Sequence, residues 1–109
     1  MVRVTVLREQ GTPVGFELNG HANEGAYGED IVCAGISAIT ETALLGITDV
    51  LQLDAAYTHE SGYARCELSR ETSLEDREKA AIVFDTMIAG LTSLQQAYPQ
   101  SLKFSYREV

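Results

Sequence analysis

The segment from Ile31 to Leu51 constrains the fold most, because it is long and strongly apolar. Its aliphatic residues cover more than one stripe of a helix, so a single neighbouring sheet would leave part of them exposed. A second subunit would cover the remaining apolar surface. The sequence therefore predicts a helix over about residues 31–51 and favours a homodimer.

Short segments with alternating apolar residues flank this helix and indicate strands. We expect strands over residues 2–8 and 15–21 with a turn at 10–13, a hairpin of strands 55–60 and 63–69 around Ser61-Gly62, and a last strand from Leu102 to Tyr106. Ser73 suits the N-cap of a second helix over residues 74–98. The predicted order is β-β-α-β-β-α-β, an α+β fold with two helices on one face of a largely antiparallel sheet. Without a linker or a shift in composition, residues 1–109 are expected to form a single domain.

The formal net charge of −8 constrains the partners. An acidic chain repels phosphate backbones, which argues against direct binding of nucleic acid. It favours a cationic partner, although an acidic surface also simply keeps a small protein in solution. We expect no membrane span and no signal peptide, hence a cytoplasmic protein whose two cysteines are thiols.

One histidine and one cysteine bracket a short polar loop. His21 falls at the end of the second predicted strand, and Cys33 follows twelve residues later. A cysteine attacks carbonyl groups as thiolate, which a cationic neighbour or a helix N-terminus stabilises. If Asp30 is the N-cap, Cys33 lies in the first turn, near the positive end of the helix dipole. The pattern indicates a nucleophile and its base.

Each of these residues also has a structural interpretation. Cys33 is equally suited to filling a small buried site, and a histidine at a strand end is often a surface residue. Asp30 suits either the N-cap or a carboxylate that orients His21, and Ser37 is a candidate for the same pocket, one turn after Cys33. Cys66 is expected in the core and His59 in solvent. Because no second pair of ligands has metal-site spacing, we expect no metal and no cofactor.

The residues Gly20-His21-Ala22, followed by Tyr27-Gly28-Glu29-Asp30-Ile31-Val32-Cys33-Ala34 and Ser37, resemble the signature of the bacterial ribosomal-processing cysteine protease (Prp) family. The resemblance implies that Cys33 is the nucleophile and His21 the base. It also implies a flexible loop that covers the bound peptide, formed by Ala22, Asn23, Glu24, Gly25, Ala26, Tyr27, Gly28 and Glu29.

The resemblance further implies a small cytoplasmic homodimer. Its substrate would be the N-terminal extension of a large-subunit ribosomal protein, number twenty-seven. The basic tail of such a protein suits an acidic enzyme. Two other functions stay open: a non-catalytic dimeric module that binds ribosome-assembly partners, and a thiol redox switch at Cys33.

Overall fold

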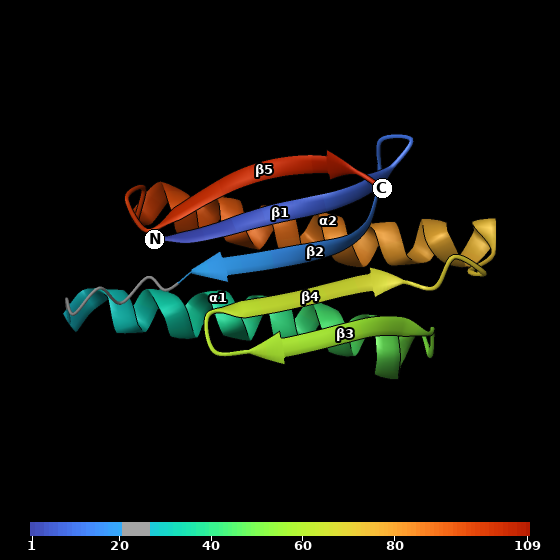
Figure 1. The fold of residues 1–109 in the computed structure, drawn as a ribbon, viewed down its shortest axis with the longest axis horizontal. Coiled ribbons are helices and arrows are strands. Elements are labelled where there is room, and N and C mark those ends of the chain that lie inside the picture. Colours follow the sequence, from blue (N-terminus) through green and yellow to red (C-terminus); the bar gives the residue numbers. More distant parts are fainter. Residues whose placement is uncertain (21–26) are drawn as a thin grey trace.

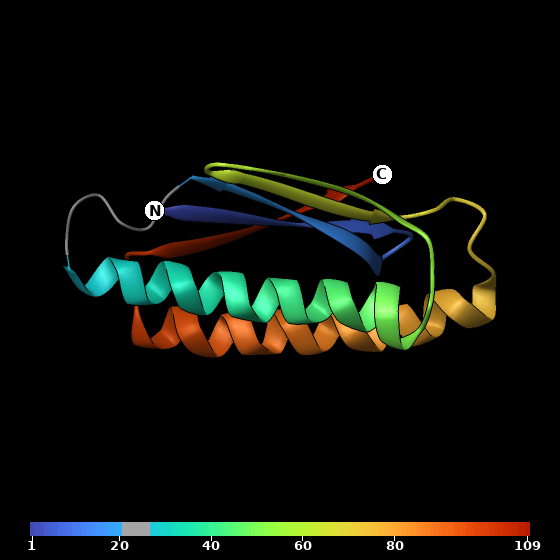
Figure 2. The ribbon, with the colours of Figure 1, turned by 90° about the horizontal axis from the view of Figure 1, so that it is seen from below.

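Five strands form one sheet, and two helices lie side by side across one of its faces (Figure 1 and Figure 2). A computed structural model describes residues 1–20 and 27–109, without the side chains of residues 27–30. The elements are β1 (Val2–Glu9), β2 (Thr12–Gly20), α1 (Tyr27–Leu45), a π-helical turn η1 (Gly46–Val50), β3 (Ala55–Glu60), β4 (Tyr63–Leu68), α2 (Leu74–Ala97) and β5 (Leu102–Glu108). The predicted order and the α+β class are confirmed.

The sheet has the strand order β3-β4-β2-β1-β5, so β3 and β5 form its two edges (Figure 1). Three of the neighbouring pairs are antiparallel, and β5 lies parallel to β1. The parallel pair arises because the chain crosses beneath the sheet through α2 before it returns as β5. The largely antiparallel sheet is therefore as predicted.

Alternating residues of the strands meet one stripe of each helix in the core. Phe16 of β2 and Phe84 of α2 pack edge to face, with ring centroids 6.3 Å apart. The buried positions of α1 and η1 recur every three or four residues, which is the spacing of one helix face: Val32, Ile36, Thr40, Ala43 and Ile47. In α2 the buried residues are Ala80, Phe84, Met87 and Leu91. Both helices thus turn one stripe toward the sheet.

The first helix begins earlier than expected. It starts at Tyr27, so Asp30 lies within its first turn and is not the N-cap, and Cys33 lies in the second turn. Tyr27, Gly28 and Glu29, predicted as part of the loop, are helical. Glycine and acidic residues are tolerated in a first turn, whose amides lack helical partners and whose dipole favours negative charge, so composition alone did not separate loop from helix. His21 and loop residues 22–26 lie outside the described residues.

The boundaries of the other helices and strands differ less from the predicted ones. The first turn consists of Gln10 and Gly11 alone, both with positive φ (51° and 82°), and β2 begins at Thr12. At its far end, α1 gives way to the wider turn η1 before residue 51. The predicted cap of α2 is confirmed, since the Ser73 hydroxyl accepts a hydrogen bond of 3.2 Å from the Asp76 amide.

Residues Ile31–Val50 have the length and mean hydropathy, 1.7, of a membrane-spanning helix. This corrects the expectation that no segment is apolar enough to span. The same helix is a core element of the fold, with one stripe buried against the sheet and α2. Only 28% of the segment is buried, so packing in the core accounts for part of its apolar character.

Candidate active site

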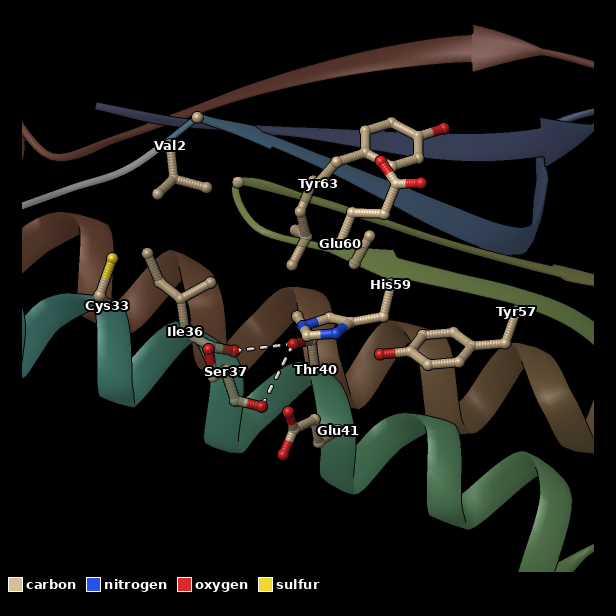
Figure 3. Close-up of a pocket in the computed structure, with 14 residues that line it drawn as sticks. Val2, Cys33, Ile36, Ser37, Thr40, Glu41, Tyr57, His59, Glu60 and Tyr63 are labelled. Atoms are coloured by element: carbon tan, nitrogen blue, oxygen red, sulfur yellow. Dashed lines mark hydrogen bonds between the residues drawn. The ribbon is translucent and has the colours of Figure 1, made fainter.

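A shallow cleft of about 120 Å³ lies between α1 and the hairpin of β3 and β4 (Figure 3). Strand β2 contributes Leu18 and its last residue, Gly20, and β1 contributes Val2. The remaining described lining residues come from α1 and the hairpin region: Cys33, Ile36, Ser37, Thr40, Glu41, Tyr57, His59, Glu60, Gly62, Tyr63 and Ala64. The cleft brings Cys33 together with residues that are up to about thirty positions away in sequence.

Cys33 stands at one end of this cleft. Its side chain is half-buried, packs against the core and points from α1 toward Val2 (Figure 3). Ser37 lies one turn later and lines the same cleft. The Thr40 hydroxyl donates to the Ile36 carbonyl at 2.9 Å and lies 3.3 Å from the Ser37 carbonyl, so it is satisfied within the helix. Cys33 is thus a thiol at the border between core and solvent.

The backbone at the end of β2 has a fixed conformation where it lines the cleft. Gly20 has φ +100°, and a Cβ atom there would lie 2.4 Å from the Met1 carbonyl oxygen. Its amide donates to the Gly62 carbonyl at 2.9 Å. Only glycine fits this backbone conformation without displacing the start of β1. The chain therefore leaves β2, one residue before His21, at a fixed point on the cleft.

The opposite end of the cleft carries residues that the sequence did not single out as a group. Tyr57 and His59 reach from β3 over α1, where Thr40 and Glu41 lie (Figure 3). His59 is exposed, as predicted, yet it lines the cleft. The available signal was the alternation in β3, which places Tyr57 and His59 opposite Cys66 and Ala64 on the helix-facing side. That Thr40 and Glu41 of α1 lie beneath these two side chains could be known only from the tertiary structure.

Cys66 has a very different environment. It is fully buried in the core, as predicted, opposite Phe16 of β2. Burial, with a smaller contribution from the Glu67 carboxylate, raises the pKa of the Cys66 thiol to about 11. A thiol with that pKa is protonated at neutral pH, so Cys66 is a core residue and not a nucleophile.

Metal chemistry finds no support in the part of the molecule that is described. Among the described side chains, no three from histidine, cysteine, aspartate and glutamate gather closely enough to hold a metal ion. The cleft therefore offers a thiol at one end, and aromatic rings with the Glu41 carboxylate at the other (Figure 3).

The chain is similar to known proteases. It is 29% identical over 110 residues to the ribosomal processing cysteine protease Prp of Bacillus subtilis, covering 94% of this chain and 95% of the relative. It is 29% identical to the protein of the same name from Staphylococcus aureus, covering 98% of this chain and 100% of the relative.

Solved structures share its fold. SMU.848 from Streptococcus mutans superposes with a TM-score of 0.85 at 28% identity, covering 100% of this chain and 96% of the other. The ribosomal processing protease Prp from S. aureus, in complex with a covalently linked product peptide, has a TM-score of 0.82 at 23% identity, covering 98% and 100%. The family model for cysteine protease Prp matches residues 1–103. Together with a cleft that presents a cysteine thiol, this match shows that the chain belongs to the cysteine protease Prp family.

Proposed function

We propose that this protease removes the N-terminal extension of large-subunit ribosomal protein twenty-seven during ribosome maturation. The observation that carries the proposal is the thiol of Cys33 at the end of an open cleft. The names of the B. subtilis and S. aureus relatives support ribosomal processing. The net charge of −8 suits a basic substrate, whose attraction weakens as salt concentration rises.

In the proposed reaction, Cys33 Sγ attacks the scissile carbonyl carbon after His21 takes the thiol proton. The tetrahedral intermediate collapses, and His21 returns the proton to the leaving amine. Water then hydrolyses the thioester, which releases the new carboxylate and restores the thiol. The reaction consumes one water molecule and needs no oxidant and no cofactor.

The position of Cys33 on α1 makes the base more important for forming the thiolate. The favourable field of a helix dipole is concentrated in the first turn, and Cys33 lies in the second. The backbone amides without helical partners, which could stabilise the oxyanion of the tetrahedral intermediate, lie at least a turn before Cys33. They are therefore not adjacent to the sulfur. A cationic neighbour is therefore the stronger means of forming the thiolate.

Two observations support His21 as that neighbour. His21 is bonded to Gly20, which lines the same cleft as Cys33. The other histidine, His59, lies over Thr40 (Figure 3), seven residues along the helix from Cys33, or about 10 Å at 1.5 Å per residue. That separation is too long for a proton transfer without intermediates.

Asp30 and the loop have narrower proposed roles than the sequence implied. Because Asp30 is not the N-cap, the role that we retain for it is to orient His21. The proposed cover over the peptide is restricted to Ala22, Asn23, Glu24, Gly25 and Ala26, since α1 begins at Tyr27.

The test is to incubate the extended ribosomal precursor with the purified protein and to identify the new N-terminus by mass spectrometry. We expect cleavage at one bond that is lost in Cys33→Ala and in His21→Ala but kept in the matched variant Cys66→Ala, whose thiol lies in the core. An intact precursor with the unmodified protein would favour the non-catalytic binding module. A mixed disulfide or sulfenic acid at Cys33 under mild oxidant, without cleavage, would favour the redox switch.

We also propose a homodimer formed through the face of the helices that points away from the sheet (Figure 2). An apolar groove of about 560 Å³ runs there between α1 and α2. It is lined by Ala38, Ile39, Thr42, Ala43, Gly46, Ile82, Val83, Thr86, Met87 and Gly90, and Ile82 is 69% exposed. A second copy that buried this groove would remove its apolar surface from water.

Sedimentation equilibrium tests the dimer. We expect a dimer for the unmodified chain and a monomer for Ile82→Glu. Leu74→Glu is the matched control, because Leu74 is 74% exposed but lies outside the groove. A monomer at all concentrations, or an intact dimer with Ile82→Glu, would contradict this interface.

We propose that the protein works in the cytoplasm, where ribosomes are assembled. Cell fractionation tests this, with the protein expected in the supernatant after sedimentation of membranes. Recovery with the membrane fraction would instead assign a membrane role to residues Ile31–Val50.

A further inference from the structure

The end of the cleft farthest from Cys33 has an aromatic wall. The rings of Tyr57 and His59 are stacked, with centroids 6.3 Å apart and planes 15° from parallel. Both residues lie on the helix-facing side of β3, and Tyr57 is 40% exposed. The wall faces α1 across the cleft (Figure 3) and has ring surface left for a ligand.

The same end of the cleft carries a negative charge on α1. Glu41 of α1 lines it, and no lysine or arginine is among the described lining residues. Its carboxylate belongs to no ion pair in the part of the chain that the structure describes. Burial and then the Glu41 charge raise the pKa of Tyr57, so the field of Glu41 reaches the aromatic wall.

We infer that Glu41, Tyr57 and His59 form a specificity subsite for a cationic side chain of the peptide substrate, with arginine preferred over lysine. The inference deepens the proposed protease function and rests on it. A planar guanidinium stacks on an aromatic face and donates two parallel hydrogen bonds to one carboxylate, whereas an ammonium group does neither as well.

The distance along α1 fixes which substrate residue reaches the subsite. Glu41 lies eight residues after Cys33, which is about 12 Å along the helix axis. An extended peptide advances about 3.3 Å per residue. The cationic side chain is therefore the third or fourth residue from the scissile bond.

The test uses peptides that span the cleaved bond of the ribosomal precursor. At each position within five residues of that bond, one peptide carries arginine, one lysine and one glutamine. We expect kcat/KM to be about tenfold higher for arginine than for glutamine at one position, the third or fourth, as suits a partly exposed charge pair. Glu41→Gln is expected to reduce this ratio to about 1, and Tyr57→Ala is expected to reduce the preference for arginine over lysine.

Glu71→Gln is the matched control, because it removes an exposed carboxylate outside the cleft. It should keep the arginine-to-glutamine ratio of the unmodified enzyme. The ratio is internal to each variant, so a general loss of activity or of folded protein cancels. An unchanged ratio in Glu41→Gln, or no position with a preference, would overturn the subsite.

Failure of the protease proposal is distinguishable from failure of the subsite. If no peptide is cleaved, the same peptides are titrated against the Cys33→Ala protein and against the Cys33→Ala, Glu41→Gln double variant by fluorescence anisotropy. Tighter binding of the arginine peptide that depends on Glu41 would support the subsite without proteolysis. Equal binding of all peptides, or no binding, would overturn it.

Discussion

The two cysteines of this chain differ in how well solvent can reach them. Cys33 is half-buried on α1 at the end of the cleft, whereas Cys66 is fully buried on β4. Burial closes Cys66 off from solvent and raises the pKa of its thiol to about 11, so this thiol is not ionised at neutral pH. The comparison teaches that position in the fold, and not residue type, decides which thiol is available for chemistry.

The largest expected effect is on catalysis. Cys33→Ala should lower kcat/KM for the ribosomal precursor by at least about 10³-fold, because it removes the proposed nucleophile. Cys66→Ala should stay within about threefold of the unmodified enzyme, since its side chain does not line the cleft. Initial rates of precursor cleavage check both variants. If Cys66→Ala abolished activity while it remained folded, the contrast between the two thiols would be wrong.

Alkylation compares the same two thiols without a substrate. With iodoacetamide at pH 8, Cys33 should be modified at least about a hundredfold faster than Cys66, because the latter is buried and ionised in about one molecule in a thousand. Peptide mass spectrometry measures the two rates. In denaturant, the alkylation rates of the two cysteines should become similar. Equal rates in the folded protein would contradict the closed environment of Cys66.

The sequence predicted those elements whose periodicity is unambiguous. Val2, Val4 and Val6 alternate as a strand must, and Ser73 before an acidic first turn identifies a helix start. The start of α1 was missed because Gly28 and Glu29 suit a loop and a first helical turn equally well. That error placed Cys33 one turn too close to the helix end.

The candidate site was predictable only where its residues are close in sequence. Cys33 and Ser37 are one turn apart on a helix, so a shared cleft follows from spacing. His59 was correctly expected to be exposed, but its position opposite Glu41 depends on β3 being an edge strand above α1. Periodicity within one segment carries no information on which helix lies beneath it.

At alkaline pH, the raised pKa of the buried Cys66 thiol should lower the free energy of unfolding. The Cys66 pKa is raised from its usual 9.0 to about 11, so the native state keeps a proton that the unfolded chain releases. This contribution is complete below pH 9 and is lost as pH rises through 11, a decrease of about 2–3 kcal/mol in the free energy of unfolding.

Urea denaturation at pH 8 and at pH 11, for the unmodified chain and for Cys66→Ala, measures that loss. The variant lacks the thiol, so its free energy of unfolding should fall less over the same interval. Other groups, such as Tyr57, titrate in both proteins and cancel in the difference. A parallel fall in both proteins would show that Cys66 has no raised pKa.

Replacing each cysteine by serine gives the smallest expected difference between the two sites, a difference in the free energy of unfolding. Cys66→Ser places a hydroxyl in the apolar core, where an unsatisfied polar group costs about 2 kcal/mol. Cys33→Ser should cost less than about 1 kcal/mol, because a hydroxyl at the cleft reaches water. Urea denaturation at pH 7 compares them, and Cys66→Ala separates the cost of the hydroxyl from that of lost packing. Equal costs at both positions would mean that the Cys33 site is as dry as the core, and a dry site would leave no water to hydrolyse the thioester that the proposed reaction forms.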